Sequence, residues 1–222
     1  MTTSQNGFLS SIPPVTKNII IINFIAWMAT LALSTRGIDL INIFGLHYFL
    51  AEDFRVYQLV SYLFLHDTSS LSHVFFNMFA VFMFGRVIET SWGSKRFLIY
   101  YAFTGIGAGL IQELVWFFEY QSLDPTYFNL PITIGASGAV FGILLAFGMM
   151  FPNTPLYIMF IPIPIKAKYF VIGYGLLELY FGVAQRNGDN VAHFAHLGGM
   201  LFGIIFILYW RRKDKRNGKH HG

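Results

Sequence analysis

Six long runs of apolar residues constrain this chain more than any other feature of its sequence. A helix needs roughly 20 mostly apolar residues to cross a bilayer, within a range of about 17 to 25. The chain is 55% hydrophobic and 12% charged, whereas soluble domains carry about 25% charged residues. We therefore expect an all-α membrane protein with six transmembrane helices. The runs cover residues 18–34, 71–89, 97–118, 131–151, 168–185 and 191–210.

The chain reads as one domain, because no linker rich in proline, glycine or serine divides it and no repeat is visible. We place this domain at residues 17–210, between a short N-terminal segment, 1–16, and a basic tail, 211–222. Cysteine is absent, which excludes disulfides, thiolate metal ligands and a cysteine nucleophile. The first run could instead be a signal peptide, since Ala32 and Ser34 form a weak cleavage pattern, but the charges favour an uncleaved span.

The positive charges indicate how the helices are oriented. Lys and Arg in short loops favour the cytoplasmic side, and with a cytoplasmic N-terminus twelve of the fifteen basic residues fall there. We therefore predict that both termini are cytoplasmic, with the basic tail at the anionic leaflet; nucleic-acid binding is the competing and weaker explanation of that tail. The twelve are Lys17, Arg86, Lys95, Arg96, Lys166, Lys168, Arg211, Arg212, Lys213, Lys215, Arg216 and Lys219.

Two connections are too irregular to be simple turns. Residues 35–70 include an apolar stretch that is too short to span a membrane, which predicts short helices at the interface. Residues 152–166 carry four prolines and so cannot form one regular helix. We expect this second segment to form an apolar hairpin that dips into the inner interface.

A serine flanked by glycines opens the fourth apolar run. Polar groups at membrane depth are costly and are functional candidates by default, and Ser137 lies between Gly135 and Gly138. A helix N-terminus presents free N–H groups that can hold an oxyanion, and glycines let a peptide backbone approach closely. Gly138 and Gly142 form a GxxxG pattern, which allows another helix to pack closely. The alternative is a packing face of small residues with an incidental serine.

A histidine opens the sixth run. His196, Gly199 and Gly203 are spaced i, i+3 and i+7, so they share one helix face. A neutral imidazole on such a small-residue face can come within hydrogen-bond distance of a serine on a facing helix and act as a general base. We interpret His193, three residues earlier, as a hydrogen-bonding neighbour of the base. A buried histidine with a purely structural role is the alternative.

Two further polar residues open the second run. His73 and Asn77 are spaced i and i+4, so they lie on one helix face. Their side chains could join the N–H of Ser137 around a developing oxyanion, an interaction often worth about 3–4 kcal/mol per donor. An interhelical hydrogen-bond pair is the alternative interpretation.

The three motifs support one another because they share a depth. With a cytoplasmic N-terminus, the second, fourth and sixth spans all run inward from the outer face. Each polar group then lies roughly 3–10 Å below that face, at 1.5 Å per residue. A nucleophile, a base and oxyanion donors at one depth are what acyl transfer requires. A transporter or channel is the rival hypothesis, but it predicts polar residues along whole spans; a non-catalytic binder of membrane proteins is the third.

Two glutamates, Glu113 and Glu178, also lie within predicted spans. Either could in principle be a third catalytic group. No acidic residue is near His196 in the sequence, however, so a dyad of Ser137 and His196 is the simpler hypothesis. We expect both glutamates to be structural, either hydrogen-bonded across helices or protonated.

Together these motifs resemble the signature of the rhomboid family of intramembrane serine proteases. That signature is His-x-x-x-Asn in the second span, Gly-x-Ser-Gly opening the fourth and Ala-His-x-x-Gly in the sixth. The chain matches its order, its spacing and its span numbers, and the resemblance covers about residues 17–210. The matching segments run from His73 to Asn77, from Gly135 to Gly138 and from Ala195 to Gly199.

The resemblance implies a rhomboid-like bundle of six helices with the serine in a water-filled cavity open to the outside. It implies Ser137 as nucleophile and His196 as general base, with His73 and Asn77 around the oxyanion and no metal or cofactor. It also implies that Phe141, four residues after the serine, packs on the histidine ring. The substrates would be transmembrane proteins, whose helices must partly unwind to be cut in or next to the bilayer.

Further positions follow from the same resemblance. Gly199 and Gly203 match glycines that bring the sixth helix against the fourth, and Glu89 has a structural role at the inner end of the second span. The fifth span is the implied gate for substrate entry. The chain departs from the family at Tyr57 and Gln58, where many members have Trp-Arg, so we expect the loop geometry to differ. The compact form suggests the plasma membrane of a bacterium.

Overall fold

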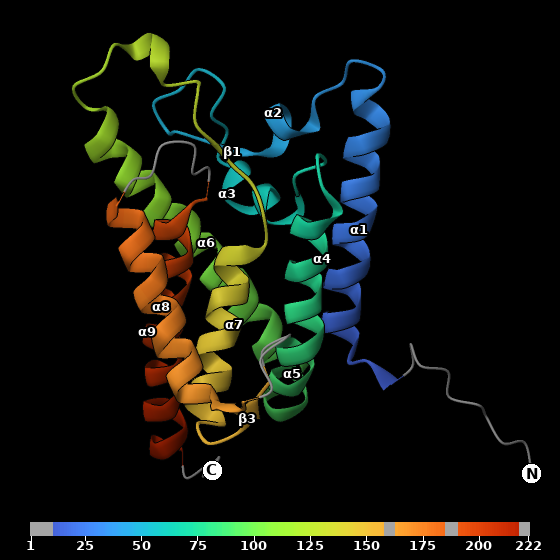
Figure 1. The fold of residues 1–222 in the computed structure, drawn as a ribbon, viewed down its shortest axis with the longest axis vertical. Helices are drawn as coiled ribbons and strands as arrows, with labels where there is room; N and C mark the ends of the chain where they lie inside the picture. The colour runs from blue at the N-terminus through green and yellow to red at the C-terminus, as the bar shows by residue number, and fades with distance from the viewer. Residues whose placement is uncertain (1–10, 158–162, 185–190, 218–222) are drawn as a thin grey trace, which may run out of the picture.

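The computed structural model describes residues 11–157, 163–184 and 191–217. Within them, long helices run side by side and are joined by short helices and two-residue strands (Figure 1). The first long helix begins, and the last one ends, at the same end of the bundle (Figure 1). Residues 1–10 of the predicted N-terminal segment, and the last five residues of the predicted tail, lie outside the described residues.

Each of the six apolar runs contains a long helix, so the all-α prediction is confirmed. Within the described residues, four helical stretches are long and apolar enough to cross a membrane: α1, α4 to α5, α6 and α9. α7 is shorter and α8 is not among the four, so the six-span count stays a prediction. The bounds are α1 (Pro14–Ser34), α4 (Leu71–Ala80), the π-helix η3 (Val81–Gly85), α5 (Arg86–Trp92), α6 (Ser94–Tyr120), α7 (Ser137–Met150), α8 (Ala167–Ala184) and α9 (His193–Arg216).

The fourth predicted span, 131–151, is wrong at its start. Ile132–Thr133 form strand β2, which pairs antiparallel with strand β1 (Leu46–His47). Gly135 then turns the chain with a φ of 121°, a backbone region that side chains with a Cβ rarely adopt. Its N–H donates to the carbonyl oxygen of Tyr62 at 2.9 Å. Because residues 132–135 form the strand and the turn, α7 begins at Ser137 and not at residue 131 as predicted.

The late start makes α7 short and places its first residue deep. α7 has 14 residues, or about 21 Å at 1.5 Å per residue, whereas the hydrocarbon core of a bilayer is about 30 Å thick. In Figure 1 α7 begins well below the level at which α1 and α6 end. Ser137 therefore lies inside the bundle instead of at its rim.

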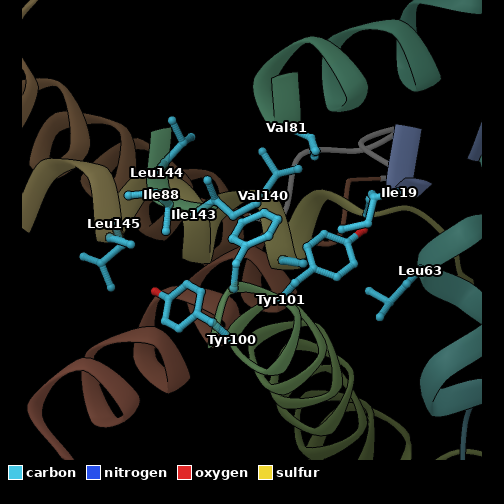
Figure 2. Close-up of a cluster of buried hydrophobic side chains, with 14 of the residues drawn as sticks. Ile19, Leu63, Val81, Ile88, Tyr100, Tyr101, Val140, Ile143, Leu144 and Leu145 are labelled. Atoms are coloured by element: carbon cyan, nitrogen blue, oxygen red, sulfur yellow. The ribbon is translucent and has the colours of Figure 1, made fainter. Parts of the chain in front are cut away.

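α7 is the centre of the bundle, and eleven of its fourteen residues are buried. Its apolar side chains pack against α6, the second span, α1 and the first loop (Figure 2). The cluster explains why so short a helix is stable, because most of its surface contacts protein. The labelled members are Ile19, Leu63, Val81, Ile88, Tyr100, Tyr101, Val140, Ile143, Leu144 and Leu145.

Small residues bring α7 against α9 and α6, as the glycine spacing predicts. A Cβ added at Gly199 would overlap the carbonyl oxygen of Gly138, so the backbones of α9 and α7 touch. A Cβ at Gly142 would lie 2.7 Å from the Cβ of Thr104 in α6. A Cβ at Gly203 would lie close to side chains of α6 and α7. A larger residue at Gly199 would therefore require the helices to move apart, whereas at Gly142 and Gly203 the neighbouring side chains would have to shift.

Glu89 holds the end of the bundle at which α1 begins, in the structural role expected of it. Its carboxylate accepts hydrogen bonds from the N–H of Val15 at 3.0 Å and from the N–H and hydroxyl of Thr16, both at 2.7 Å. The hydroxyl of Ser94 donates to the same carboxylate at 2.6 Å. Glu89 thus caps the first turn of α1, where N–H groups have no intrahelical partner, and ties it to the start of α6.

α9 continues six residues past the predicted boundary of the tail and ends at Arg216. Asp214 there accepts two hydrogen bonds from the guanidinium of Arg96 in α6, at 2.7 and 2.8 Å. The predicted hairpin at 152–166 is seen in its described ends, where β3 (Pro155–Leu156) pairs with β4 (Ile165–Lys166). Residues 158–162 of that segment lie outside the described residues.

The first loop contains short helices, as predicted. Gln58, one of the two residues that depart from the family pattern, is only 1% exposed. Its side-chain amide donates to the carbonyl oxygens of Ile43 at 3.2 Å and Asp53 at 3.0 Å, and its oxygen accepts from the N–H of Arg55. The side-chain amide of Gln58 therefore links two separate parts of this loop, at Ile43 and at Asp53–Arg55, by hydrogen bonds. The short helices of this loop are α2 (Leu40–Phe44), α3 (Gln58–Ser61) and η2 (Tyr62–Phe64), and a further one, η4 (Pro125–Tyr127), lies between α6 and β2.

Candidate active site

The structure brings the predicted nucleophile and base into contact. Ser137 Oγ lies 2.8 Å from His196 Nε2. Ser137 is the first residue of α7 and half-buried, and His196 lies in the first turn of α9 with 8% of its surface exposed. The contact between Gly199 and Gly138 lies immediately inward of this pair. The close approach of the two backbones therefore sets the distance between the two side chains.

An aromatic stack holds the ring of His196. The Phe141 ring lies parallel to it, with centroids 4.4 Å apart and an interplanar angle of 9°. The other face of Phe141 stacks on Tyr174 of α8, at 5.1 Å and 5°. Phe141 is one turn after Ser137, as the family resemblance implied. Tyr174 was not predicted, because a tyrosine in an apolar run carries no signal of its own.

A carboxylate completes the contacts of the histidine. Glu178 of α8, 7% exposed, accepts at Oε2 from His196 Nδ1 at 2.8 Å and from His193 Nδ1 at 2.6 Å. An ionised carboxylate only accepts hydrogen bonds, so Nδ1 of His196 carries a proton. His196 Nε2 is then the acceptor for the hydroxyl of Ser137. His193 is a hydrogen-bonding neighbour, as expected, although its partner here is Glu178.

Sequence reasoning did not predict this contact: it weighed Glu178 as a possible third catalytic group but expected it to be structural. A signal was present: Tyr174 and Glu178 are spaced i and i+4, which puts an aromatic ring and a carboxylate on one face of the fifth helix. Nothing in the sequence, however, relates that face to the start of the sixth helix.

The same cluster is the group of described residues that could hold a metal ion. One ligand atom each from Glu178, His193 and His196 lies within 4.8 Å of the others. Ligand bonds of about 2.0–2.2 Å in a tetrahedral site put neighbouring ligand atoms roughly 3.3 Å apart. The two nitrogen–oxygen distances are 2.6 and 2.8 Å, so the three side chains are arranged as hydrogen-bond partners.

His73 approaches the serine from the second span. Its Nδ1 accepts from the N–H of Asp67 at 3.2 Å, so the neutral ring carries its proton on Nε2. A Cβ added at Gly135 would lie 3.0 Å from that nitrogen and 3.7 Å from Ser137 Oγ. The donor of His73 and the hydroxyl of Ser137 therefore flank the same glycine.

Asn77 lies one turn deeper and is 8% exposed. Its amide donates to the backbone oxygen of His73 at 2.9 Å, which uses one of its two N–H groups. The loop before α4 contacts His73 through the N–H of Asp67 and the ring of His66. Hydrogen bonds from the hydroxyl and N–H of Ser69 hold the pKa of Asp67 below its usual value. Burial lowers the pKa of His66 to about 3.

A cavity of about 720 Å³ opens beside the polar cluster, between α6, α8, α9 and β2. His193 lines it, but Ser137 and His196 do not. Glu178 is therefore linked to this cavity through its hydrogen bond with His193. Other lining residues are Trp116, Glu119, Thr133, Phe181 and Phe194.

The sequence matches a known family and several curated proteins. The model of the rhomboid domain matches residues 53–213, which include every residue of the site. "Rhomboid-like protein 11, chloroplastic" of Arabidopsis thaliana is 28% identical over 204 residues, 85% of this chain and 62% of the relative. "Rhomboid protein 1, mitochondrial" of Saccharomyces cerevisiae is 29% identical over 62% of this chain and 37% of the relative. "Rhomboid protease AarA" of Providencia stuartii is 29% identical over 64% of this chain and 52% of the relative. The chain thus spans less than two thirds of the length of these relatives.

Proposed function

Since the chain belongs to the rhomboid family, and is thus a multi-pass integral membrane protein, we propose that it is an intramembrane serine endopeptidase. The observation that carries the proposal is the 2.8 Å contact between Ser137 Oγ and His196 Nε2 at the buried start of α7. The name of the Providencia stuartii relative, a rhomboid protease, supports the same activity. Ser137 is the proposed nucleophile and His196 the proposed general base.

In the first half of the reaction, Ser137 Oγ attacks the carbonyl carbon of the scissile peptide while its proton passes to His196 Nε2. The oxyanion forms at the start of α7, where the N–H of Ser137 and Nε2–H of His73 can donate to it. Asn77 has a second amide N–H for the same purpose. His196 then gives its proton to the leaving nitrogen as the C–N bond breaks. Water hydrolyses the acyl-enzyme with His196 again as base, so the chemistry uses no metal or cofactor.

The proposed substrates are transmembrane helices of other proteins, cut within or next to the bilayer. Support comes from the short α7, which places Ser137 below the ends of α1 and α6. A helix hides its carbonyl carbons in hydrogen-bonded turns, so the substrate must unwind locally before Ser137 can attack. No role in nucleic-acid binding is proposed for the basic tail, which instead suits an anionic leaflet.

We further propose that α7 and α8 complete six spans, with both termini in the cytoplasm and the site open to the outer side. The distribution of Lys and Arg supports this orientation. The bacterial plasma membrane is the proposed location, although two of the relatives are named as chloroplastic and mitochondrial. Its support is the similarity to the rhomboid protease of the bacterium Providencia stuartii.

The test uses the full chain reconstituted in liposomes with a single-span protein substrate and a fluorophosphonate probe. Wild type is expected to cleave the substrate and to be labelled by the probe. Ser137→Ala is expected to lose both properties, and His196→Ala to lose nearly all of both, while both variants remain folded. Undiminished cleavage by Ser137→Ala would show that another nucleophile, or a contaminating protease, is responsible.

A further inference from the structure

A buried carboxylate on a helix whose surface is largely exposed needs a physical reason. Only four residues of α8 are buried among eighteen, and Glu178 is one of them. An ionisable group within a span is costly and is retained where it is paired. Both hydrogen bonds of Glu178 converge on the same oxygen, Oε2, and come from the two histidines of α9. The geometry therefore directs its charge at the ring that contacts the serine.

We propose that Glu178 is a positioning residue that completes a Ser137–His196–Glu178 triad. The inference rests on the proposed function of Ser137 and His196. By accepting from Nδ1 at 2.8 Å, the carboxylate fixes the tautomer in which Nε2 is free to take the serine proton. Together with Phe141, which covers one face of the ring at 4.4 Å, it fixes the direction in which Nε2 points.

The carboxylate also acts during the reaction. When Ser137 Oγ bonds to the carbonyl carbon, its proton moves to Nε2 and the imidazole becomes a cation. The proton on Nδ1 stays on His196, so Glu178 remains ionised and faces that cation at hydrogen-bond distance. When the leaving nitrogen takes the Nε2 proton, the ring returns to its neutral form. Glu178 thus stabilises the charge that appears only between these two proton transfers.

His193 has a supporting part in this arrangement. Its Nδ1 lies 2.6 Å from the oxygen that His196 also contacts. Two donors from successive turns of α9 therefore hold one oxygen of Glu178, which leaves the carboxylate little freedom to turn away. The contact with Ser137 Oγ is made by His196, so the loss of His193 is expected to loosen Glu178 without removing the base.

The alternative is that Glu178 has a purely structural role and only connects α8 to α9. α8 buries few residues, and the implied gate for substrate is this same helix. A fastening contact would be expected to restrain the gate, so that its removal leaves the turnover number unchanged or raises activity by easing entry. A positioning role predicts the opposite, because the base loses its tautomer and its counter-charge whether or not the gate is open.

The experiment measures kcat and KM for the full chain in liposomes, together with the rate of fluorophosphonate labelling. Glu178→Gln is expected to lower kcat by about tenfold or more, the scale of an acid–base contribution, and to leave KM within about threefold. The labelling rate falls by a similar factor, since the probe also needs an activated serine. Glu178→Asp, which keeps the charge but retracts it, is expected to recover part of the lost kcat.

Glu113→Gln is the matched control. Glu113 is a second buried glutamate in a span, and its carboxylate accepts from the N–H of Phe49 at 2.9 Å, in the first loop. The same change of chemistry at this position is expected to leave kcat within about twofold, because no reacting atom depends on it.

The outcomes separate the two proposals. If Glu178→Gln retains the kcat of wild type, or is more active, while Ser137→Ala is inert, the triad is wrong and the proposed protease stands. If Ser137→Ala still cleaves, the proposed function itself fails. Should Glu178→Gln not fold, proton NMR of the His193→Gln protein decides: a far-downfield Nδ1 proton on His196 is expected, and its absence overturns the triad.

Discussion

Beside the site, helix α9 packs against α7 and α8, and it uses different kinds of residue in the two contacts. Against α7 it presents glycine, so that Gly199 touches the carbonyl oxygen of Gly138. Against α8 it presents His193 and His196, which bind the carboxylate of Glu178. α7 has eleven of fourteen residues buried, whereas α8 has four of eighteen.

This difference indicates which contacts of the proposed catalytic site would persist if α8 moved. Ser137 and His196 flank the place where the backbones of α7 and α9 touch. Because this contact involves no flexible side chain, it keeps the two residues together. Glu178 sits on α8, which buries a much smaller share of its residues than α7 does. If α8 moves, the serine and the base stay matched, while the proposed third member of the triad leaves with the moving helix.

Gly199→Val gives the largest effect that this comparison predicts. Its Cβ would occupy the position of the Gly138 oxygen, so α9 must shift away from α7. A displacement of about 1 Å between reacting groups can cost about a hundredfold in rate, and we expect at least that loss of cleavage with a lower thermal midpoint. The cleavage rate and the thermal unfolding midpoint are measured on the same preparation.

Gly173→Ala is the control on the other helix. A Cβ at Gly173 would meet no atom within 4 Å, and alanine favours a helix over glycine by about 0.8–1.0 kcal/mol. We expect unchanged activity and an equal or higher thermal midpoint. If Gly173→Ala loses as much activity as Gly199→Val, close packing against α7 is not what distinguishes α9.

Phe141→Ala is expected to have an intermediate effect, because Phe141 lies between the two contacts. Its ring stacks on His196 on one side and on Tyr174 of α8 on the other. Aromatic pairs are worth about 0.5–1.5 kcal/mol beyond their burial, and losing the one on His196 corresponds to about a 2- to 13-fold lower kcat. Phe141→Leu keeps most of the volume, so a similar loss there would assign the effect to the stack.

Arg96→Gln is expected to have the smallest effect. Arg96 and Asp214 join α6 to the far end of α9 at 2.7 Å, with 30% and 12% of their side chains exposed. Asp214 is buried, so the loss of its partner is expected to lower the stability of this end of α9, but α9 is already fixed near the site by its glycine contact with α7. Cleavage should stay within about twofold of wild type, and a larger loss would mean that the inner end of α9 controls the site.

The local patterns of the sequence predicted most of this architecture. Apolar run length located all six helices, because hydrophobicity is a property of consecutive residues. The contact of Ser137 with His196 followed from three motifs that fall at one depth. The start of α7 did not, since it depends on β2 pairing with β1, far earlier in the chain. The partners of Glu178 were missed for the same reason, because they lie on a different helix.

The π-helix in the second span carries a further consequence. Val81–Gly85 separates α4, which bears His73, from α5, which bears Glu89. A π-turn accommodates one extra residue, and each residue of a helix accounts for about 100° of rotation. Because the wide turn absorbs the extra residue, the two halves keep nearly the angular phase of an unbroken α-helix, so that His73 faces Ser137 while Glu89 holds α1. The position of His73 in the site therefore depends on the rotation of α4 relative to α5, which the π-helix sets.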